Sequence, residues 1–359
     1  MESKKTDLRF AALNPYWQTN VVSSEAKRMT GRDWYVWGDE NRYPDYLLEL
    51  YDNCTTLHSI IGGFVDYVAG NGAEVLGREA LNKRGDTAED IVRALAFSYA
   101  VYGGFALQVI RDAVGKVAEV YSIQPRFLRT NEDNTVFWYS ERWGRTGRVQ
   151  VIEYPKFLQR GGDASQASSI LFWKDADYQV YPSPVYAASV KAAEVERSID
   201  TYHLNNINNG FMGSYIVNFN NGIPAEDAIK DEIERDFNEK FSGKENAGRI
   251  MLAWNNDKEH AVTLQKMEVS DYGEKYDTLA KHCRQQLFTA FRANPNLFGI
   301  PTEDKGFSNE EYEESFRLFN RTRIQPIQKA IVGAFDKMGW QLTIEPFTLD
   351  GVSEREVTA

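Results

Sequence analysis

The residues that could carry out acid–base chemistry gather in one short stretch, residues 303–314, where six acids accompany a single lysine. Two carboxyl groups at a fixed separation can act as general acid and base in glycoside hydrolysis. Glu310 with Glu311, or Glu313 with Glu314, offers such a pair. Acids in the first turns of a helix are also typical of a solvated helix surface, because they complement the helix dipole. The stretch therefore admits two interpretations, a glycan hydrolase site or a structural acidic segment.

Other catalytic and metal-binding patterns are missing from the sequence. It contains no GxxxxGK[ST], no GxGxxG after a strand, no GxSxG and no HExxH, which disfavours phosphoryl transfer by this chain. Cys283 follows His282 directly, and adjacent residues on a helix point apart, so they do not form a nucleophile pair. We expect no metal, no cofactor and no enzymatic activity. The histidines, none at metal-ligand spacing, are His58, His203, His260 and His282.

Composition narrows the class of protein. The 359 residues are 42% hydrophobic, so the chain can bury a large core, and its length predicts more than one folding unit. Two cysteines, Cys54 and Cys283, indicate a reducing, cytoplasmic setting. No apolar run reaches the roughly 18 residues of a membrane span, and nothing marks the chain for export. The net charge of -11 disfavours a protein that binds nucleic acid tightly by neutralising its phosphates. It does not exclude a protein that lets DNA slide along its surface.

The elements before residue 183 predict an α+β unit that follows an N-terminal arm. Pro44 suits the first turn of one helix, and Gly70 can end the next. Thr87 and Asp90 have capping-box spacing for a third helix, which Gly103 would end. The sequence then changes to short β-branched and aromatic runs, which are typical of antiparallel strands. The predicted strands are FALQVIR, KVAEVYSI, TVFWYS, VQVIEY and SILFWK.

Long helices dominate the second half of the chain. One is predicted from Ser183 and Pro184 to Gly210, and another over 271–292. Between them, a strand, a helix and two further strands, the last of which is AVTLQKM, indicate a small α/β module. The breaker-rich stretch FGIPTEDKGF then leads to a helix with a capping box at Ser308, which Pro326 should kink.

Three stretches give the chain a resemblance to the portal proteins of tailed bacteriophages, the HK97-like family. The last of them contains a fold-ending FGIP, a variable loop, SNEE with a Phe a few residues on, and a proline in RIQPIQ. Together they follow the family's order of elements from residue 41 to about 345. The stretches are NRYPDYLLELYDNCTTLHSIIGGFVDYVAGNG at 41–72, FSGKENAGRIMLAW at 241–254 and LFTAFRANPNLFGIPTEDKGFSNEEYEESFRLFNRTRIQPIQKAI at 287–331.

The resemblance implies a portal-like α+β fold with an α/β wing, long stem helices, a small α/β clip and a kinked C-terminal helix. The sequence ends soon after WQLTIEPF, so we expect no long crown. The implied divisions are an N-terminal arm at 1–40, the wing at 41–182, stem helices at 183–212 and 268–297, the clip at 213–267, a tunnel loop at 298–308, a wing or crown helix and terminal strand at 309–346, and a tail at 347–359.

The resemblance also implies a function without catalysis. Twelve copies would form a ring at one capsid vertex, which conducts double-stranded DNA during packaging and ejection. The implied partners are further copies of this chain, double-stranded DNA, the large terminase, the major capsid or scaffolding protein and a head-to-tail connector, with no membrane. The protein would belong to the virion and assemble in the cytoplasm of the bacterial host. The alternative within this class is a head-to-tail connector or another phage structural adaptor.

The implied sites are two groups of loop residues. The tunnel loop would face the duplex, with Lys305 as a transient phosphate contact between acids that repel DNA. The tunnel-loop residues are Thr302, Glu303, Asp304, Lys305, Gly306 and Phe307. The clip residues expected to contact partner proteins are Asn220, Asn221, Gly222, Asp257 and Lys258.

Ring contacts also need apolar anchors. Four tryptophans could serve as exposed anchors between copies, and burial in the core is the equal alternative. They are Trp34, Trp37, Trp138 and Trp143.

Overall fold

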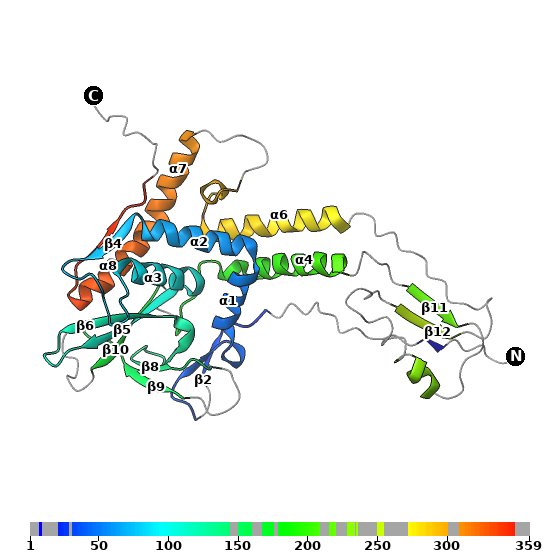
Figure 1. The fold of residues 1–359 in the computed structure, drawn as a ribbon, viewed down its shortest axis with the longest axis horizontal. Helices are drawn as coiled ribbons and strands as arrows, with labels where there is room; N and C mark the ends of the chain where they lie inside the picture. Colours follow the sequence, from blue (N-terminus) through cyan, green and yellow to red (C-terminus); the bar gives the residue numbers. More distant parts are fainter. Residues whose placement is uncertain are drawn as a thin grey trace. The chain divides into compact units, whose positions relative to one another are not determined.

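The computed structural model divides the chain into two compact units (Figure 1). One contains residues 1–20 and 195–281, and the other contains residues 21–194 and 282–359. The predicted borders of arm, wing, stem, clip and tail stay predictions. The structure describes residues 7–8, 21–28, 31–143, 150–159, 167–175, 179–208, 215–219, 228–233, 235, 250–254, 272–300 and 309–348.

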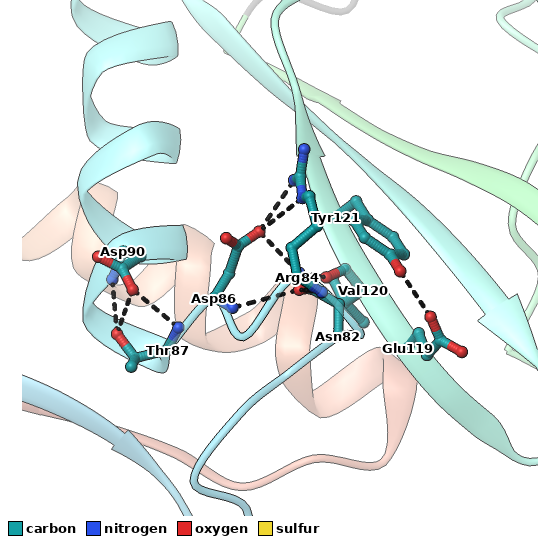
Figure 2. Close-up of polar contacts among 8 residues, drawn as sticks. All are labelled: Asn82, Arg84, Asp86, Thr87, Asp90, Glu119, Val120 and Tyr121. Carbon is teal, nitrogen blue, oxygen red and sulfur yellow. Dashed lines mark hydrogen bonds and ion pairs between the residues drawn. The ribbon is translucent and has the colours of Figure 1, made fainter.

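The larger unit begins with three helices, α1 (Tyr43–Asn53), α2 (Thr55–Ala69) and α3 (Ala88–Tyr102), which pack on one another. Their predicted ends are confirmed. Pro44 lies in the first turn of α1, and Gly70 ends α2 at a φ of 65°. The Thr87 hydroxyl accepts a hydrogen bond from the Asp90 amide at 3.2 Å, and the Asp90 carboxylate accepts one from the Thr87 amide at 2.9 Å (Figure 2).

Antiparallel strands follow, as predicted. The central strand β5 pairs with β6 on one side and β10 on the other, and α3 packs on β5. A second sheet has the order β7-β8-β9, while β4 pairs with β13 and β2 pairs with β3. The strands are β2 (Ala26–Arg28), β3 (Tyr35–Trp37), β4 (Gly72–Val75), β5 (Gly104–Arg111), β6 (Val117–Ile123), β7 (Leu128–Thr130), β8 (Val136–Tyr139), β9 (Ile152–Pro155), β10 (Ser168–Lys174) and β13 (Leu342–Glu345).

The loop before α3 covers the free edge of β6. The Val120 amide donates to the Leu81 carbonyl at 3.0 Å, and the Asn82 amide nitrogen donates to the Val120 carbonyl at 2.8 Å. Asn82 also donates to Asp86, which pairs with Arg84 at 2.9 Å (Figure 2). Because an unpaired strand edge invites pairing with other chains, this loop protects the sheet along that part of β6.

The four tryptophans lie in or against the core, so the prediction of exposed anchors is wrong. Trp37, Trp138 and Trp143 are buried, and Trp34 is half-buried with its ring 5.7 Å from Trp138 and 5.5 Å from Trp143. Two of them face Arg129, whose guanidinium lies 4.9 Å from the Trp143 ring and 6.0 Å from the Trp37 ring. Burial lowers the pKa of Arg129 to about 10. A buried cation needs hydrogen-bond acceptors, and backbone carbonyls at 2.7–3.0 Å supply them; these are Asn41, Arg126 and Leu128.

The helix predicted from Ser183 begins later than expected. A 3₁₀ turn, η3 (Ala187–Ser189), precedes α4 (Val190–Asn208). Tyr186 explains the delay, because it is fully buried and its hydroxyl donates to the Val101 carbonyl at 2.9 Å. Burial of this ring holds the chain in a non-helical conformation at Tyr186, so tertiary packing overrides the local start signal of Pro184.

The smaller unit contains the predicted α/β module. Strands β11 (Tyr215–Phe219) and β12 (Ile250–Trp254) pair in parallel, and residues 228–233 between them are helical. Parallel neighbours require a crossover connection, which fits this order. The sequence did not predict β1 (Asp7–Leu8), which pairs antiparallel with β12. The strand predicted at AVTLQKM lies outside the described residues.

Two further helical stretches complete the described chain. The predicted helix α6 (Tyr272–Phe291) is followed by the 3₁₀ helix η5 (Pro295–Phe298). α7 (Asn309–Phe319) then continues through a π-helical segment (Asn320–Ile324) into α8 (Gln325–Met338). Within the described segments, no helix combines the length and the apolar run that crossing a bilayer requires.

Candidate functional site: the segment between α6 and α7 and its anchor

All the predicted site residues lie outside the described residues. This holds for the tunnel-loop residues within 302–307, and for the clip residues within 220–222 and 257–258. Ser308, the predicted cap of α7, also lies outside them. What the structure describes is the base of the segment 301–308, from Ile300 on one side and Asn309 on the other.

The chain that leads into this segment is tightly ordered by its own side chains. Asn294 caps η5 by accepting a hydrogen bond from the Asn296 amide at 3.2 Å, and Gly299 ends η5 at a φ of 73°. The Asn294 amide nitrogen also donates to the Ser315 hydroxyl of α7 at 3.0 Å. The Asn294 side chain therefore connects η5, before residues 301–308, with α7, after them.

Aromatic rings pack the same base against α2. The Phe298 ring lies so close to Gly63 that a β-carbon there would be 2.7 Å from it. Ring centroids lie 5.9 Å apart for Tyr67 and Phe298, 5.8 Å for Phe298 and Phe319, and 5.7 Å for Tyr67 and Phe316. The first two pairs meet edge to face, and such contacts stabilise an aromatic cluster beyond the area that it buries.

Tyr67 also holds the base through its hydroxyl, which donates to the Leu297 carbonyl at 2.7 Å. Burial, assisted by Tyr312 and Asp66, raises the pKa of Tyr67 well above its ordinary value. The hydroxyl is therefore protonated at neutral pH and keeps this hydrogen bond. We call Gly63, Tyr67, Leu297, Phe298, Phe316 and Phe319 the loop anchor.

A π-helical segment joins the loop anchor to the end of α6. Pro326 has no amide hydrogen, and in a regular α-helix its ring would crowd the carbonyl four residues before it. The preceding turn is wider than an α-helical turn, and the Gln325 amide donates to the Asn320 carbonyl. The predicted disturbance at Pro326 is therefore a π segment. Arg323 in this segment donates to the Phe291 carbonyl at 3.2 Å, and burial lowers its pKa.

The acidic residues of α7 lie on its outer surface. Glu310, Glu311 and Glu314 are exposed, and Glu313 pairs with Arg317 at 3.3 Å. Neither of the two best-formed clefts among the described residues is lined by them. This placement is that of a solvated helix face.

The remaining candidates for chemistry have ordinary structural contacts. His58 stacks on Tyr51 at 4.4 Å, and His282 contacts Gln286 at 2.9 Å. Cys54 and Cys283 are buried, and His260 lies outside the described residues. Among the part of the chain that the structure describes, no group of three or more potential metal ligands comes together.

Comparison with known proteins decides the family. The family model described as "Phage portal protein" matches residues 78–350, more than half of the chain. The chain belongs to the phage portal protein family. This match confirms the resemblance stated from the sequence, and it favours a portal over a head-to-tail connector. No curated protein matches the chain by sequence.

Several solved structures are similar to this chain in fold. The chain in the neck of an empty gene transfer agent particle has 16% identity and a TM-score of 0.53, covering 92% of this chain and 89% of that one. The chain in the virion of a native gene transfer agent particle has 16% identity and a TM-score of 0.51, and the match covers 85% of this chain and 84% of that one. An HK97-family phage portal protein from Corynebacterium diphtheriae has 11% identity and a TM-score of 0.45, and the match covers 83% of this chain and 94% of that one.

The loop anchor is a packing feature that the sequence did not reveal. Its members come from α2, η5 and α7, so residues more than 200 positions apart in the chain meet. The available signal was the pair Gly62 and Gly63 in the interior of α2. Adjacent glycines inside a helix lower its stability, which suggests that another group approaches closely there.

Proposed function

We propose that this portal protein closes into a ring of twelve copies at one capsid vertex and conducts double-stranded DNA into and out of the particle. Membership of the portal family supports this proposal. The portal family is structural, and we propose that this chain likewise catalyses no reaction. ATP hydrolysis would come from a large terminase that docks on the ring.

The observation that carries the proposal is the loop anchor. The loop anchor holds the chain on both sides of the segment 301–308 through a 2.7 Å hydrogen bond and a packed aromatic cluster, and the 3.0 Å hydrogen bond from Asn294 to Ser315 joins the same two sides. A segment held in this way can extend toward a ring axis without transmitting its motion to the helices behind it. In this proposal residues 302–307 face the duplex.

Charge explains how DNA would pass without adhering. Each copy contributes Glu303 and Asp304 to the segment and exposes Glu310, Glu311 and Glu314 on α7. A ring of these acids would repel a polyanion, whereas a basic wall would bind it in a salt-dependent way. Lys305 would supply a single transient phosphate contact per copy.

The remaining partners follow from the same model. We propose that the turns of the smaller unit contact the terminase and a head-to-tail connector, and that the larger unit contacts the major capsid or scaffolding protein. The protein would assemble in the cytoplasm of the bacterial host and become part of the virion. The proposed contact residues of the smaller unit are Asn220, Asn221, Gly222, Asp257 and Lys258.

Mass photometry of the purified protein tests the ring. We expect a discrete species of about twelve subunits that persists on dilution, together with end-on views that show a central channel. A monomer at every concentration, with no channel in any view, would contradict the proposal. A hydrolase would instead release reducing ends from a glycan panel, and this release would be lost in Glu310→Gln and Glu313→Gln.

A further inference from the structure

A cleft of about 650 Å³ in the larger unit has only basic, apolar and neutral polar walls. It lies where β4, the hairpin of β5 and β6, and the end of α8 meet. No acidic side chain lines this described cleft, although the chain as a whole carries a net charge of -11. Its charged residues are Arg78, Arg111, Lys116 and Lys337, and its large apolar residues are Val75, Leu76, Val117, Phe157, Met338 and Trp340.

The two arginines are held in place by neutral groups. The Arg78 guanidinium lies 4.0 Å from the centre of the Trp340 ring and donates to the carbonyls of Val117 and Ala118 at 3.3 Å and 3.2 Å. Stacking on an aromatic ring and bonding to carbonyls orient a guanidinium without neutralising its charge. Arg78 therefore keeps unused N–H donors and a full positive charge.

Arg111 is arranged in the same way on the other wall. Its guanidinium lies 4.9 Å from the centre of the Phe157 ring. It donates to the carbonyls of Gly115 at 2.6 Å and Leu158 at 2.7 Å. Two guanidinium groups are thus fixed in advance, which lowers the entropy that a bound carboxylate would have to overcome.

None of the four cations makes an ion pair with another described residue. Lys116 and Lys337 are exposed. One apolar side chain of the cleft, Leu76, is also open to solvent, being 76% exposed. The four cations, which have no carboxylate partner among the described residues, are the feature that points to an acidic partner, and the exposed leucine offers it one apolar contact.

We propose that this basic cleft docks an acidic peptide segment of a partner protein, with its carboxylates on the arginines and lysines and a large apolar side chain against Leu76 and Trp340. Charge complementarity selects the acidic segment. The apolar walls favour a peptide over nucleic acid, because a sugar–phosphate backbone has no large apolar group to bury there. No residue of the loop anchor lines the cleft, so this proposal stands whether or not the channel function holds.

Fluorescence anisotropy with a labelled eight-residue peptide of glutamate and leucine tests the proposal. We expect saturable binding that weakens with added salt, and no binding of the matched glutamine–leucine peptide. The variant Lys116→Glu with Lys337→Glu should raise the Kd about tenfold or more. The control is Lys329→Glu, an exposed residue of the same helix, α8, that does not line the cleft; its Kd should be unchanged.

A second variant separates the apolar contact from the charges. Leu76→Ser alters a side chain that is mostly in solvent, so the fold should persist, and the peptide should bind several-fold more weakly. If the double charge reversal fails to fold, Lys116→Glu alone, in the exposed turn of the hairpin, gives the charge test. Absence of saturable binding, equal weakening by Lys329→Glu, or tighter and Leu76-independent binding of a duplex oligonucleotide would overturn the proposal.

Discussion

Replacing Gly63 by alanine tests the loop anchor most sharply, because the same helix provides a matched control at the preceding position. A β-carbon at Gly63 would lie 2.7 Å and 2.8 Å from two ring carbons of Phe298. At Gly62 a β-carbon would have no neighbour within 4 Å. Both positions lie in the interior of α2, so the two substitutions differ only in what the new methyl group meets.

The magnitude follows from two opposing contributions. Glycine to alanine in a helix interior stabilises by about 1 kcal/mol, and both variants gain this amount. Inserting a methyl group into a packed contact costs about 1–3 kcal/mol, and only Gly63→Ala incurs this cost. The free energies of unfolding of Gly62→Ala and Gly63→Ala should therefore differ by about 1–3 kcal/mol, with Gly63→Ala the less stable.

Urea unfolding at one fixed protein concentration measures this difference. We expect a lower midpoint for Gly63→Ala than for Gly62→Ala, with the same dependence on urea. Phe298→Leu should cost less stability in Gly63→Ala than in the parent, because the smaller side chain relieves the clash with the new methyl group and the two positions are coupled. Equal midpoints for the two alanine variants would refute the close contact between α2 and η5.

Three further changes are expected to have measurable effects. Tyr67→Phe leaves the buried Leu297 carbonyl without its 2.7 Å donor and should lower the free energy of unfolding by about 1–2 kcal/mol in urea. The hydrogen bond from the Thr87 hydroxyl lowers the pKa of Asp90 in the folded state, so this carboxylate stabilises the fold at neutral pH. That contribution should disappear as the pH falls below about 4. Thermal unfolding of Thr87→Ala should therefore show a smaller loss of stability over the same pH interval. Glu303→Lys should make the assembled ring retain duplex DNA at low salt and release it as salt rises, measured by filter binding.

Signals that act within a few residues predicted the fold well. Thr87 and Asp90 form their capping box, and Gly70 and Gly103 end their helices with positive φ. These signals work because the partner groups lie within one helical turn, where the sequence fixes their separation. At Pro326 the sequence predicted a kink; the structure has a π segment before the proline, which the sequence did not specify.

Long-range packing accounts for what the sequence did not predict. The start signal at Pro184 failed because Tyr186 is buried against Phe291, more than 100 residues away. The contact between Gly63 and Phe298 has the same origin, since a pairing across the chain leaves no local pattern. The basic cleft likewise combines Arg78, Arg111 and Lys337, which no motif connects.

Electron microscopy of the ring with a gold label on residue 305 tests the central claim most directly. Cys54 and Cys283 are buried, so the variant Lys305→Cys offers a single accessible thiol for the label. If the segment between α6 and α7 faces the channel, end-on class averages will show a closed ring with the label density around its axis. A particle without a ring, or a ring with the label on its outer rim, would contradict the account.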